Sequence, residues 1–110
     1  YASSKDNGKT FSKKDPVSAT PSAKHPQLAI ANTGEQLIVW DEGALNGSRI
    51  GLEIRSVDGK KRGTGYLTDS IYYASFPVIK PFGKGFIVAY TGREQADDNE
   101  KVFYKVIHPL

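Results

Sequence analysis

The stretch Ser4-Lys5-Asp6-Asn7-Gly8-Lys9-Thr10-Phe11 carries the strongest structural signal in the chain. It has the residue types of a tight hairpin turn, in which the Asp6 carboxylate accepts hydrogen bonds from turn amides and from the Thr10 hydroxyl. Gly8 can adopt the positive φ that closes such a turn. The Phe11 ring is expected to pack into a neighbouring apolar layer. The stretch therefore predicts a β-hairpin near the start of the sequence.

Beyond this turn, the chain consists of short strand candidates separated by further turns. We find no window of about eleven residues with the three- and four-residue apolar spacing of an amphipathic helix. The strand candidates are rich in Val, Ile and aromatic residues and are bounded by Gly- and Asn-containing turns. They lie at 27–31, 36–40, 49–55, 76–80, 85–90 and 101–107, with weaker candidates at 10–13 and 65–68. This pattern predicts an all-β, antiparallel architecture.

Composition limits the classes of protein that fit. The 110 residues are 38% hydrophobic and 25% charged, which is typical of a globular chain. No apolar run approaches the roughly 18 residues of a spanning helix, so no membrane span is expected. The absence of cysteine excludes disulfides and thiolate sites. The net charge is +3, but the basic clusters at 13–14 and 60–62 lie in turns, so no nucleic-acid partner is expected.

The strands recur with a period of about fifty residues. Ala23-Lys-His-Pro26 aligns with Ala74-Ser-Phe-Pro77 at a shift of 51, and Ser4-Lys-Asp6 aligns with Ser56-Val-Asp58 at a shift of 52. A period of this length built from short strands is typical of a β-propeller blade, which cannot bury both faces of its sheet alone. We therefore expect one segment, 1–110, that contains two blades in permuted phase, with repeats at about 1–51 and 52–110.

The 4–11 stretch fits the pattern Ser/Thr-x-Asp-x-Gly-x-Thr-Trp/Phe at every specified position, and so resembles the Asp-box of sialidase-like (bacterial neuraminidase repeat) β-propellers. The stretch 56–63 keeps Ser and Asp but is one residue short before Gly and lacks Thr and the aromatic residue, so it resembles a degenerate Asp-box. The resemblance implies two antiparallel four-stranded blades of a larger, six-bladed propeller. The structural Asp-box residues that it implies are Ser4, Asp6, Gly8, Thr10, Phe11, Ser56, Asp58 and Gly59.

The resemblance also implies a ligand face opposite the Asp-boxes. The loops that form it would be 15–25, 41–48, 69–75 and 91–100. An arginine there can hold a carboxylate and a tyrosine ring can stack on a sugar. Adjacent residues of a strand point to opposite faces, so at most one of Tyr72 and Tyr73 faces a ligand, and neighbouring Asp41 and Glu42 diverge. The candidate ligand contacts are His25, Trp40, Asp41, Glu42, Tyr72, Tyr73, Arg93 and Glu94.

No complete sialidase active site is expected in this chain. Such a site implies three arginines, a Tyr nucleophile with its Glu, and an Asp acid/base, whereas Arg93 alone of the four arginines lies clearly in a ligand-face loop. Trp40 and Tyr90 end equivalent strands, where packing between blades competes with sugar stacking as their role. His25 and His108 lack a third ligand at metal-like spacing, so neither a metal nor another cofactor is expected.

The leading hypothesis is a non-catalytic part of a sialidase-like propeller that acts as a scaffold or as a ligand- or partner-binding module. One alternative is a portion of a sialidase-type glycoside hydrolase that other blades complete, and another is a lectin-like carbohydrate-binding module. Two blades would leave apolar flanks and strand edges open. The expected partner is therefore the remaining blades, from another chain or from identical copies, as in a trimer. The resemblance implies an extracellular or periplasmic location.

Overall fold

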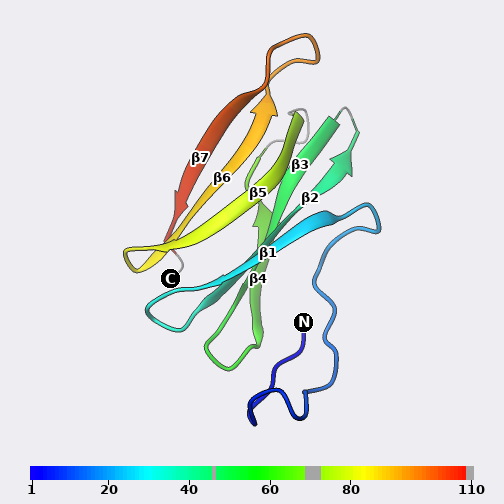
Figure 1. The fold of residues 1–110 in the computed structure, drawn as a ribbon. Coiled ribbons are helices and arrows are strands. Elements are labelled where there is room, and N and C mark those ends of the chain that lie inside the picture. Colours follow the sequence, from blue (N-terminus) through cyan, green and yellow to red (C-terminus); the bar gives the residue numbers. More distant parts are fainter. Residues whose placement is uncertain (46, 69–72, 109–110) are drawn as a thin grey trace.

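The protein is all-β. A computed structural model describes residues 1–45, 47–68 and 73–108, and these residues form seven strands and no helix (Figure 1). The prediction of an all-β fold is thus confirmed. The strands are β1 (Lys24–Ile30), β2 (Gln36–Ala44), β3 (Gly47–Arg55), β4 (Lys61–Tyr66), β5 (Tyr73–Phe82), β6 (Gly85–Arg93) and β7 (Lys101–Ile107).

The seven strands belong to one open, mixed sheet. Its order is β1-β2-β3-β5-β6-β7, and β4 pairs with β3 beside that path. All pairings within β1–β4 and within β5–β7 are antiparallel. A single parallel bridge, Ser48 to Tyr73, joins β3 to β5. The expectation of a wholly antiparallel arrangement is therefore wrong at this junction, because β4 reverses the chain between β3 and β5 and leaves these two strands running in the same direction.

The first three strands of the two antiparallel groups follow the same plan. We call β1–β4 unit 1 and β5–β7 unit 2. In unit 1 Trp40 of β2 lies opposite Gly51 of β3, and in unit 2 Tyr90 of β6 lies opposite Phe103 of β7. The registers of the two units thus correspond at shifts of 50 residues for the second strand and 52 for the third. Within the described residues unit 2 has three strands, so a group of four is present in unit 1 alone.

A bulge recurs at the same place in both units. His25 in β1 and Phe76 in β5 have positive φ values of 55° and 54°, although neither is glycine and each precedes a proline. The pairing register shifts at these points, between Lys24 and Gln27 in unit 1 and between Ser75 and Val78 in unit 2. A positive φ is uncommon for such residues, so its recurrence 51 positions apart is a structural counterpart of the repeat in the sequence.

Each unit has two faces, which we call A and B, because side chains alternate across a sheet. Face A comprises Ala29, Leu37, Val39, Ile50, Leu52 and Ile54 in unit 1 and Val78, Phe82, Ile87, Ala89, Val102, Tyr104 and Val106 in unit 2. Face B comprises Leu28, Ile30, Gln36, Ile38, Trp40, Glu53 and Arg55 in unit 1 and Ile79, Phe86, Val88, Tyr90, Phe103, Lys105 and Ile107 in unit 2.

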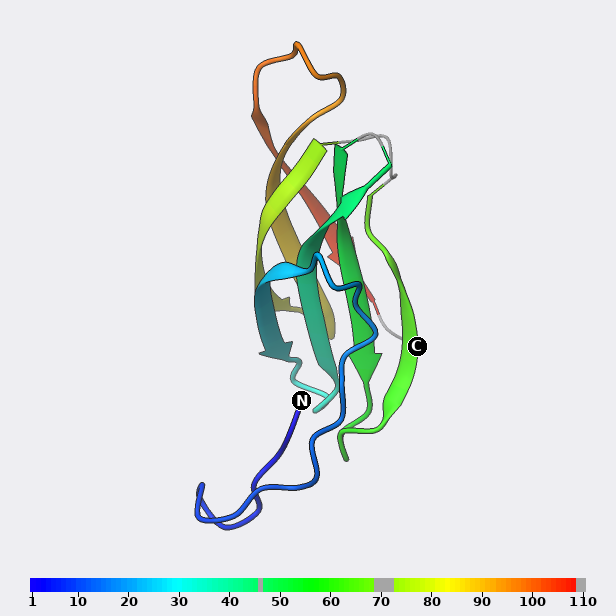
Figure 2. The same ribbon diagram turned by 90° about the vertical axis from the view of Figure 1, so that its right-hand side faces the viewer.

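The hydrophobic core lies between face A of unit 1 and face B of unit 2. One buried cluster joins Leu37 and Val39 with Phe86 and Val88, all of which are fully buried. Although β5 pairs only with β3 in unit 1, it also contacts β1 and β2, so the sheet folds back on itself beyond the β3–β5 bridge (Figure 2). The two remaining faces, A of unit 2 and B of unit 1, are left outside this core.

An N-terminal arm, residues 1–23, precedes β1 and contains no strand. Its first part extends past the end of the sheet and reverses there before the chain returns to β1 (Figure 1). The weaker strand candidate at 10–13 is therefore not formed. Phe11 lies on this projecting part and is 65% exposed. The expectation that Phe11 packs into an apolar layer is wrong for this chain, because the sheet does not reach the far end of the arm.

Candidate functional site

The turn at Ser4–Phe11 is held by side-chain hydrogen bonds that centre on Asp6. The Asp6 carboxylate accepts from the Thr10 amide at 2.9 Å and from the Thr10 hydroxyl at 2.6 Å. The Ser4 hydroxyl donates to Asp6 at 2.8 Å and accepts from the Gly8 amide at 2.8 Å. Gly8 has a φ of 87°, as its place in the turn requires.

These hydrogen bonds act on the acidity of Asp6. They lower its pKa from 3.8 to about 2, with the Thr10 hydroxyl as the largest contributor, followed by the Thr10 amide and Ser4. The bonds stabilise the charged form of the carboxylate. The turn is thus a self-contained structural element whose carboxylate is already occupied, so Asp6 is not available to a ligand.

The second turn, 56–60, joins β3 to β4 and repeats part of this arrangement. The Ser56 hydroxyl donates to Asp58, which also accepts from the Lys60 amide at 3.2 Å. The Ser56 amide donates to the Lys60 carbonyl at 2.9 Å, and Gly59 has a φ of 87°. The hydrogen bond from Ser56, followed by that from the Lys60 amide, lowers the pKa of Asp58. Both turns lie at the same end of the molecule, away from the β2–β3 and β6–β7 loops of the expected ligand face (Figure 1).

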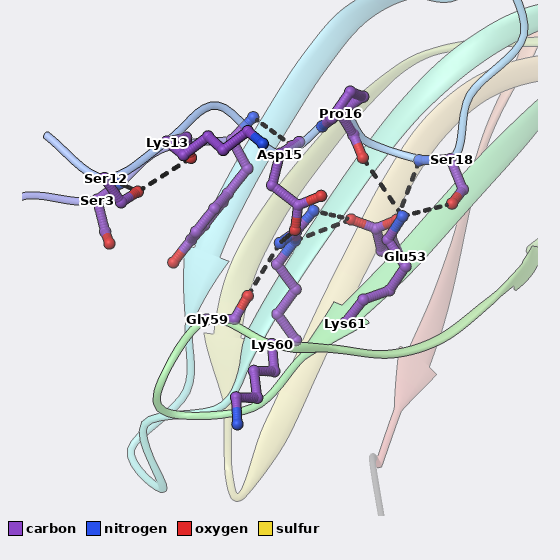
Figure 3. A network of polar contacts seen from close by, with 12 residues as sticks. Ser3, Ser12, Lys13, Asp15, Pro16, Ser18, Glu53, Gly59, Lys60 and Lys61 are labelled. Carbon is purple, nitrogen blue, oxygen red and sulfur yellow. Dashed lines mark hydrogen bonds and ion pairs between the residues drawn. The ribbon is translucent and has the colours of Figure 1, made fainter.

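A buried ionic network joins the arm to face B of unit 1 (Figure 3). The Arg55 guanidinium donates from Nε to Glu53 at 2.9 Å and from Nη1 to Asp15 at 2.7 Å and to the Gly59 carbonyl at 2.9 Å. The side chains of Arg55 and Glu53 have no exposed surface, whereas that of Asp15 is 53% exposed. Burial alone would lower the pKa of Arg55, but Asp15 and Glu53 outweigh it and raise that pKa.

Further contacts complete the network. The Ser18 amide donates to Glu53 at 3.0 Å, and Lys61 Nζ lies 3.5 Å from the same carboxylate. The Tyr1 ring lies under the Arg55 guanidinium at 4.2 Å from its centroid. A buried charge is tolerated only when it is paired and hydrogen-bonded. Because Arg55, Glu53, Asp15 and Lys61 each have a partner of opposite sign, the network fixes the arm on the sheet.

A second ionic cluster surrounds Glu42 on the same face. Its carboxylate accepts from Trp40 Nε1 at 2.6 Å and from Arg49 Nε and Nη2 at 3.1 and 3.0 Å. Burial raises the pKa of Glu42, but the hydrogen bonds from Trp40 and Arg49 outweigh it and the net shift is downward. Trp40 and Glu42 are 3% and 1% exposed. These two expected ligand contacts are therefore occupied by each other and offer no surface to a ligand.

Asp41 lies on the opposite face of β2 and joins the two units. One of its oxygens, Oδ2, accepts from the Phe76 amide at 2.8 Å and lies 2.7 Å from His25 Nδ1. The rings of His25 and Phe76 contact each other, with centroids 4.4 Å apart. Asp41 is 4% exposed. The prediction that Asp41 and Glu42 diverge is confirmed, and Asp41 has a role that the sequence did not indicate: it connects the two bulges.

A cavity of about 250 Å³ opens in unit 2 at the end opposite the turns. Tyr73 and Arg93 lie opposite each other on β5 and β6, and the Arg93 guanidinium lies 4.9 Å from the centre of the Tyr73 ring. The buried Nε of Arg93 has no hydrogen-bond partner in the part of the chain that the structure describes. The cavity is lined by Tyr73, Ala74, Tyr90, Gly92, Arg93, Glu94, Phe103 and Lys105. We call it the ligand-face cavity.

The expected ligand contacts thus fall into three places. Tyr73, Arg93 and Glu94 line the ligand-face cavity, His25 and Asp41 form the inter-unit contact, and Trp40 and Glu42 are buried together. Tyr72 lies outside the described residues. Lys105 and Phe103 of the cavity were not predicted; the repeat could have suggested Phe103, because it lies opposite Tyr90.

The four arginines differ in their ionic partners. Three of the four arginines are paired with carboxylates: Arg49 with Glu42, Arg55 with Glu53 and Asp15, and Arg62 with Glu35. Within the described residues Arg93 forms no ion pair with a carboxylate; its guanidinium lies beside the Tyr73 ring in the lining of the ligand-face cavity. Within the described ranges no group of three His, Cys, Asp or Glu side chains is arranged to hold a metal ion, and no helix could span a bilayer.

Comparison of the chain with protein-family models, with curated proteins and with solved structures found no match.

Proposed function

We propose that the chain is a two-blade segment of a sialidase-like Asp-box β-propeller that acts as a non-catalytic scaffold and binding module. The observation that carries this proposal is the repeated unit: the same bulge and the same strand register occur in both units. Face A of the first unit packs on face B of the second. Blades of a propeller stack in this way, each burying one face on the next. Asp-box hydrogen bonds in the first turn, and their partial counterpart after β3, support the assignment to sialidase-like propellers.

In this proposal unit 1 is a complete four-stranded blade. Unit 2 supplies three strands of the next blade, and the arm supplies the end of a preceding one. The arm supports this reading because its turn corresponds to the β3–β4 turn, and because Ser12 and Asp15 donate backbone hydrogen bonds to Ser3 and Tyr1 as a fourth strand would to a third. The remaining blades complete a ring of six. A secreted or periplasmic location belongs to the same proposal.

The binding role rests on the ligand-face cavity. Arg93 offers a guanidinium edge for a carboxylate, and Tyr73, Tyr90 and Phe103 supply aromatic walls. A cavity of about 250 Å³ admits one small ring. We propose an acidic monosaccharide as the ligand class. The pairing of the other three arginines supports a binding role over the alternative of sialidase-type hydrolysis within this chain.

The test is a titration of isotope-labelled protein with N-acetylneuraminic acid, followed by two-dimensional NMR. We expect the largest amide shifts at Tyr73, Arg93 and Glu94, and their loss in Arg93→Gln. The matched control is Arg62→Gln, an arginine paired with Glu35 at the opposite end of the molecule, which should leave the shifts unchanged. Absence of shifts in the native protein would remove the binding role.

The hydrolase alternative is tested with an aryl sialoside. We expect no release of the aryl group above the rate in buffer. Release that is abolished in Arg93→Gln but not in Arg62→Gln would overturn the non-catalytic assignment and favour a sialidase-type hydrolase.

A further inference from the structure

The two faces left outside the core correspond to the two faces that form it. Face A of unit 2 corresponds to face A of unit 1 at a shift of 50 positions in the second strand and 52 in the third. Ile87 thus corresponds to Leu37, Ala89 to Val39 and Tyr104 to Leu52. In unit 1 this face is buried against face B of the next unit. In unit 2 it is open, with Val102 76% exposed and Tyr104 68% exposed.

Face B of unit 1 offers the complementary surface. Its first strand presents Leu28 and Ile30, which are 52% and 56% exposed. Beside them a shallow apolar groove is lined by Tyr1, Val17, Pro26, Gln27, Leu28 and Ile38. Ile38 is the counterpart of Val88, which in unit 2 packs on unit 1. The groove thus occupies the place that face A of a preceding unit would fill.

The arm already marks the edge of this docking site. In unit 2, Lys105 on face B donates to the Leu67 carbonyl just after β4. Its counterpart in unit 1, Glu53, accepts from the Ser18 amide of the arm. The arm therefore lies across face B of unit 1 much as the segment after β4 lies across face B of unit 2.

We propose that a second copy of this chain docks head-to-tail, with face A of its unit 2 on face B of unit 1. This inference rests on the proposed function, since it takes the packing between the two units as the template for packing between chains. A second copy is the expected occupant because the open face A of unit 2 shares its strand plan with the buried face A of unit 1. Such a contact is heterologous, because it joins two different faces, so chains can add head to tail until a ring closes. A ring of three copies would contain six units.

Docking requires the start of the arm to make room for β7 of the second copy. Tyr1–Ser3 corresponds in the repeat to 105–107 of β7, so a docked copy brings its own β7 to the place where Tyr1–Ser3 now pairs with 12–15 of the arm. The outer edge of β7 has no strand partner within the described ranges. We expect the arm to exchange the hydrogen bonds of Ser12 and Asp15 for bonds to that edge.

The test uses two variants, each with one altered face. Tyr104→Glu places a charge on face A of unit 2, and Leu28→Glu places a charge on face B of unit 1; both positions are exposed in the single chain, so folding should persist. By sedimentation equilibrium we expect each variant alone to keep the single-chain mass of 12.0 kDa. An equimolar mixture should form a one-to-one dimer, because one intact A face meets one intact B face.

Leu45→Glu is the matched control, since Leu45 is 93% exposed in the β2–β3 turn and belongs to neither face. It should associate like the native protein. A native protein that remains a single chain up to near-millimolar concentration would overturn the inference, as would a Leu28→Glu variant that still dimerises, because that result indicates a symmetric A-on-A contact.

A second readout separates this inference from the proposed function. The His25 and Phe76 rings should give nuclear Overhauser contacts in every variant, because their contact lies within one chain. A single-chain protein that keeps these contacts contradicts only the second copy. Loss of the contacts in the native protein contradicts the packing of the two units, and with it the propeller proposal.

Discussion

The same face is covered in two different ways in the two units. Face B of unit 2 is covered by apolar side chains of unit 1, and its strand pair Tyr90–Phe103 stacks at 5.8 Å. Face B of unit 1 is covered in part by the arm, through the ions of Arg55, Glu53 and Asp15. Apolar burial is non-directional and gives stability in proportion to area. Paired buried charges give little net stability, but they require one specific arrangement of partners. The ion pairs therefore fix the position of the arm, whereas apolar burial stabilises the core.

The largest effect is expected where one partner of the ionic network is removed. Arg55→Met leaves Glu53 buried with Lys61 and the Ser18 amide as its remaining partners, and should lower the free energy of unfolding by about 3–5 kcal/mol. Urea unfolding measures this loss, and trypsin cleavage at the arm lysines reports release of the arm. The control Arg62→Met breaks a partly exposed pair and should cost at most about 1 kcal/mol.

The double variant Glu53→Gln with Arg55→Met separates charge from packing. It should recover part of the loss, because no unpaired buried charge remains. If Arg55→Met and Arg62→Met were equally stable, the network would not hold the arm.

The next effect concerns the contact between units. Asp41→Ala leaves the part-buried Phe76 amide without its acceptor and should lower the free energy of unfolding by about 1–3 kcal/mol. Thr91 is the counterpart of Asp41 on the open face of unit 2, and Thr91→Val should change stability by less than half as much. Equal losses for the two variants would mean that Asp41 does not connect the units.

A smaller effect is expected at the position where β3 has Gly51 and its counterpart β7 has Phe103. A Cβ at Gly51 would lie 2.4 Å from the Trp40 ring, so Gly51→Ala should displace the indole and cost about 1–3 kcal/mol. A Cβ added at Gly63 or Gly65 in the neighbouring β4 would meet no atom within 4 Å, so Gly63→Ala is the matched control. Tryptophan fluorescence should shift in Gly51→Ala alone; an unchanged spectrum would contradict the packing of Trp40 on β3.

The smallest effect on global stability is expected at the first turn. The pKa of Asp6 is lowered from 3.8 to about 2, so the carboxylate stabilises the turn fully above the unfolded value and loses this contribution as the pH falls through about 2. The Thr10 amide shift should follow that titration. Thr10→Val removes the largest contributor and should move the midpoint upward toward 3.8. A midpoint that is the same in both proteins would contradict the hydrogen bond.

The strands could be predicted from sequence because each is a run of β-branched and aromatic residues between turn residues. The repeat was visible because His25-Pro26 and Phe76-Pro77 recur at one spacing. Their positive φ was not visible, since a residue before proline ordinarily adopts an extended conformation.

The parts that were missed depend on contacts between distant residues. Asp15 and Arg55 are 40 positions apart, and no local pattern marks Arg55 and Glu53 as buried partners of the arm. The burial of Phe11 was wrongly predicted for the same reason. The Asp-box pattern specifies the turn, but burial of the Phe11 ring requires a distant layer of side chains, and the described sheet does not extend to this part of the arm. Of the expected ligand contacts, Tyr73, Arg93 and Glu94 come together because Tyr73 begins β5 opposite Arg93 at the end of β6, and Glu94 follows Arg93.

Native-state hydrogen exchange tests most directly whether the two units share one core. We expect the slowest amides of β2 and β6 to exchange with the same free energy of opening, because face A of unit 1 and face B of unit 2 must separate before either strand is released. A set of β6 amides that opens at a distinctly lower free energy than those of β2 would show that the units fold separately, and would contradict the packing on which the propeller proposal and the head-to-tail interface both rest.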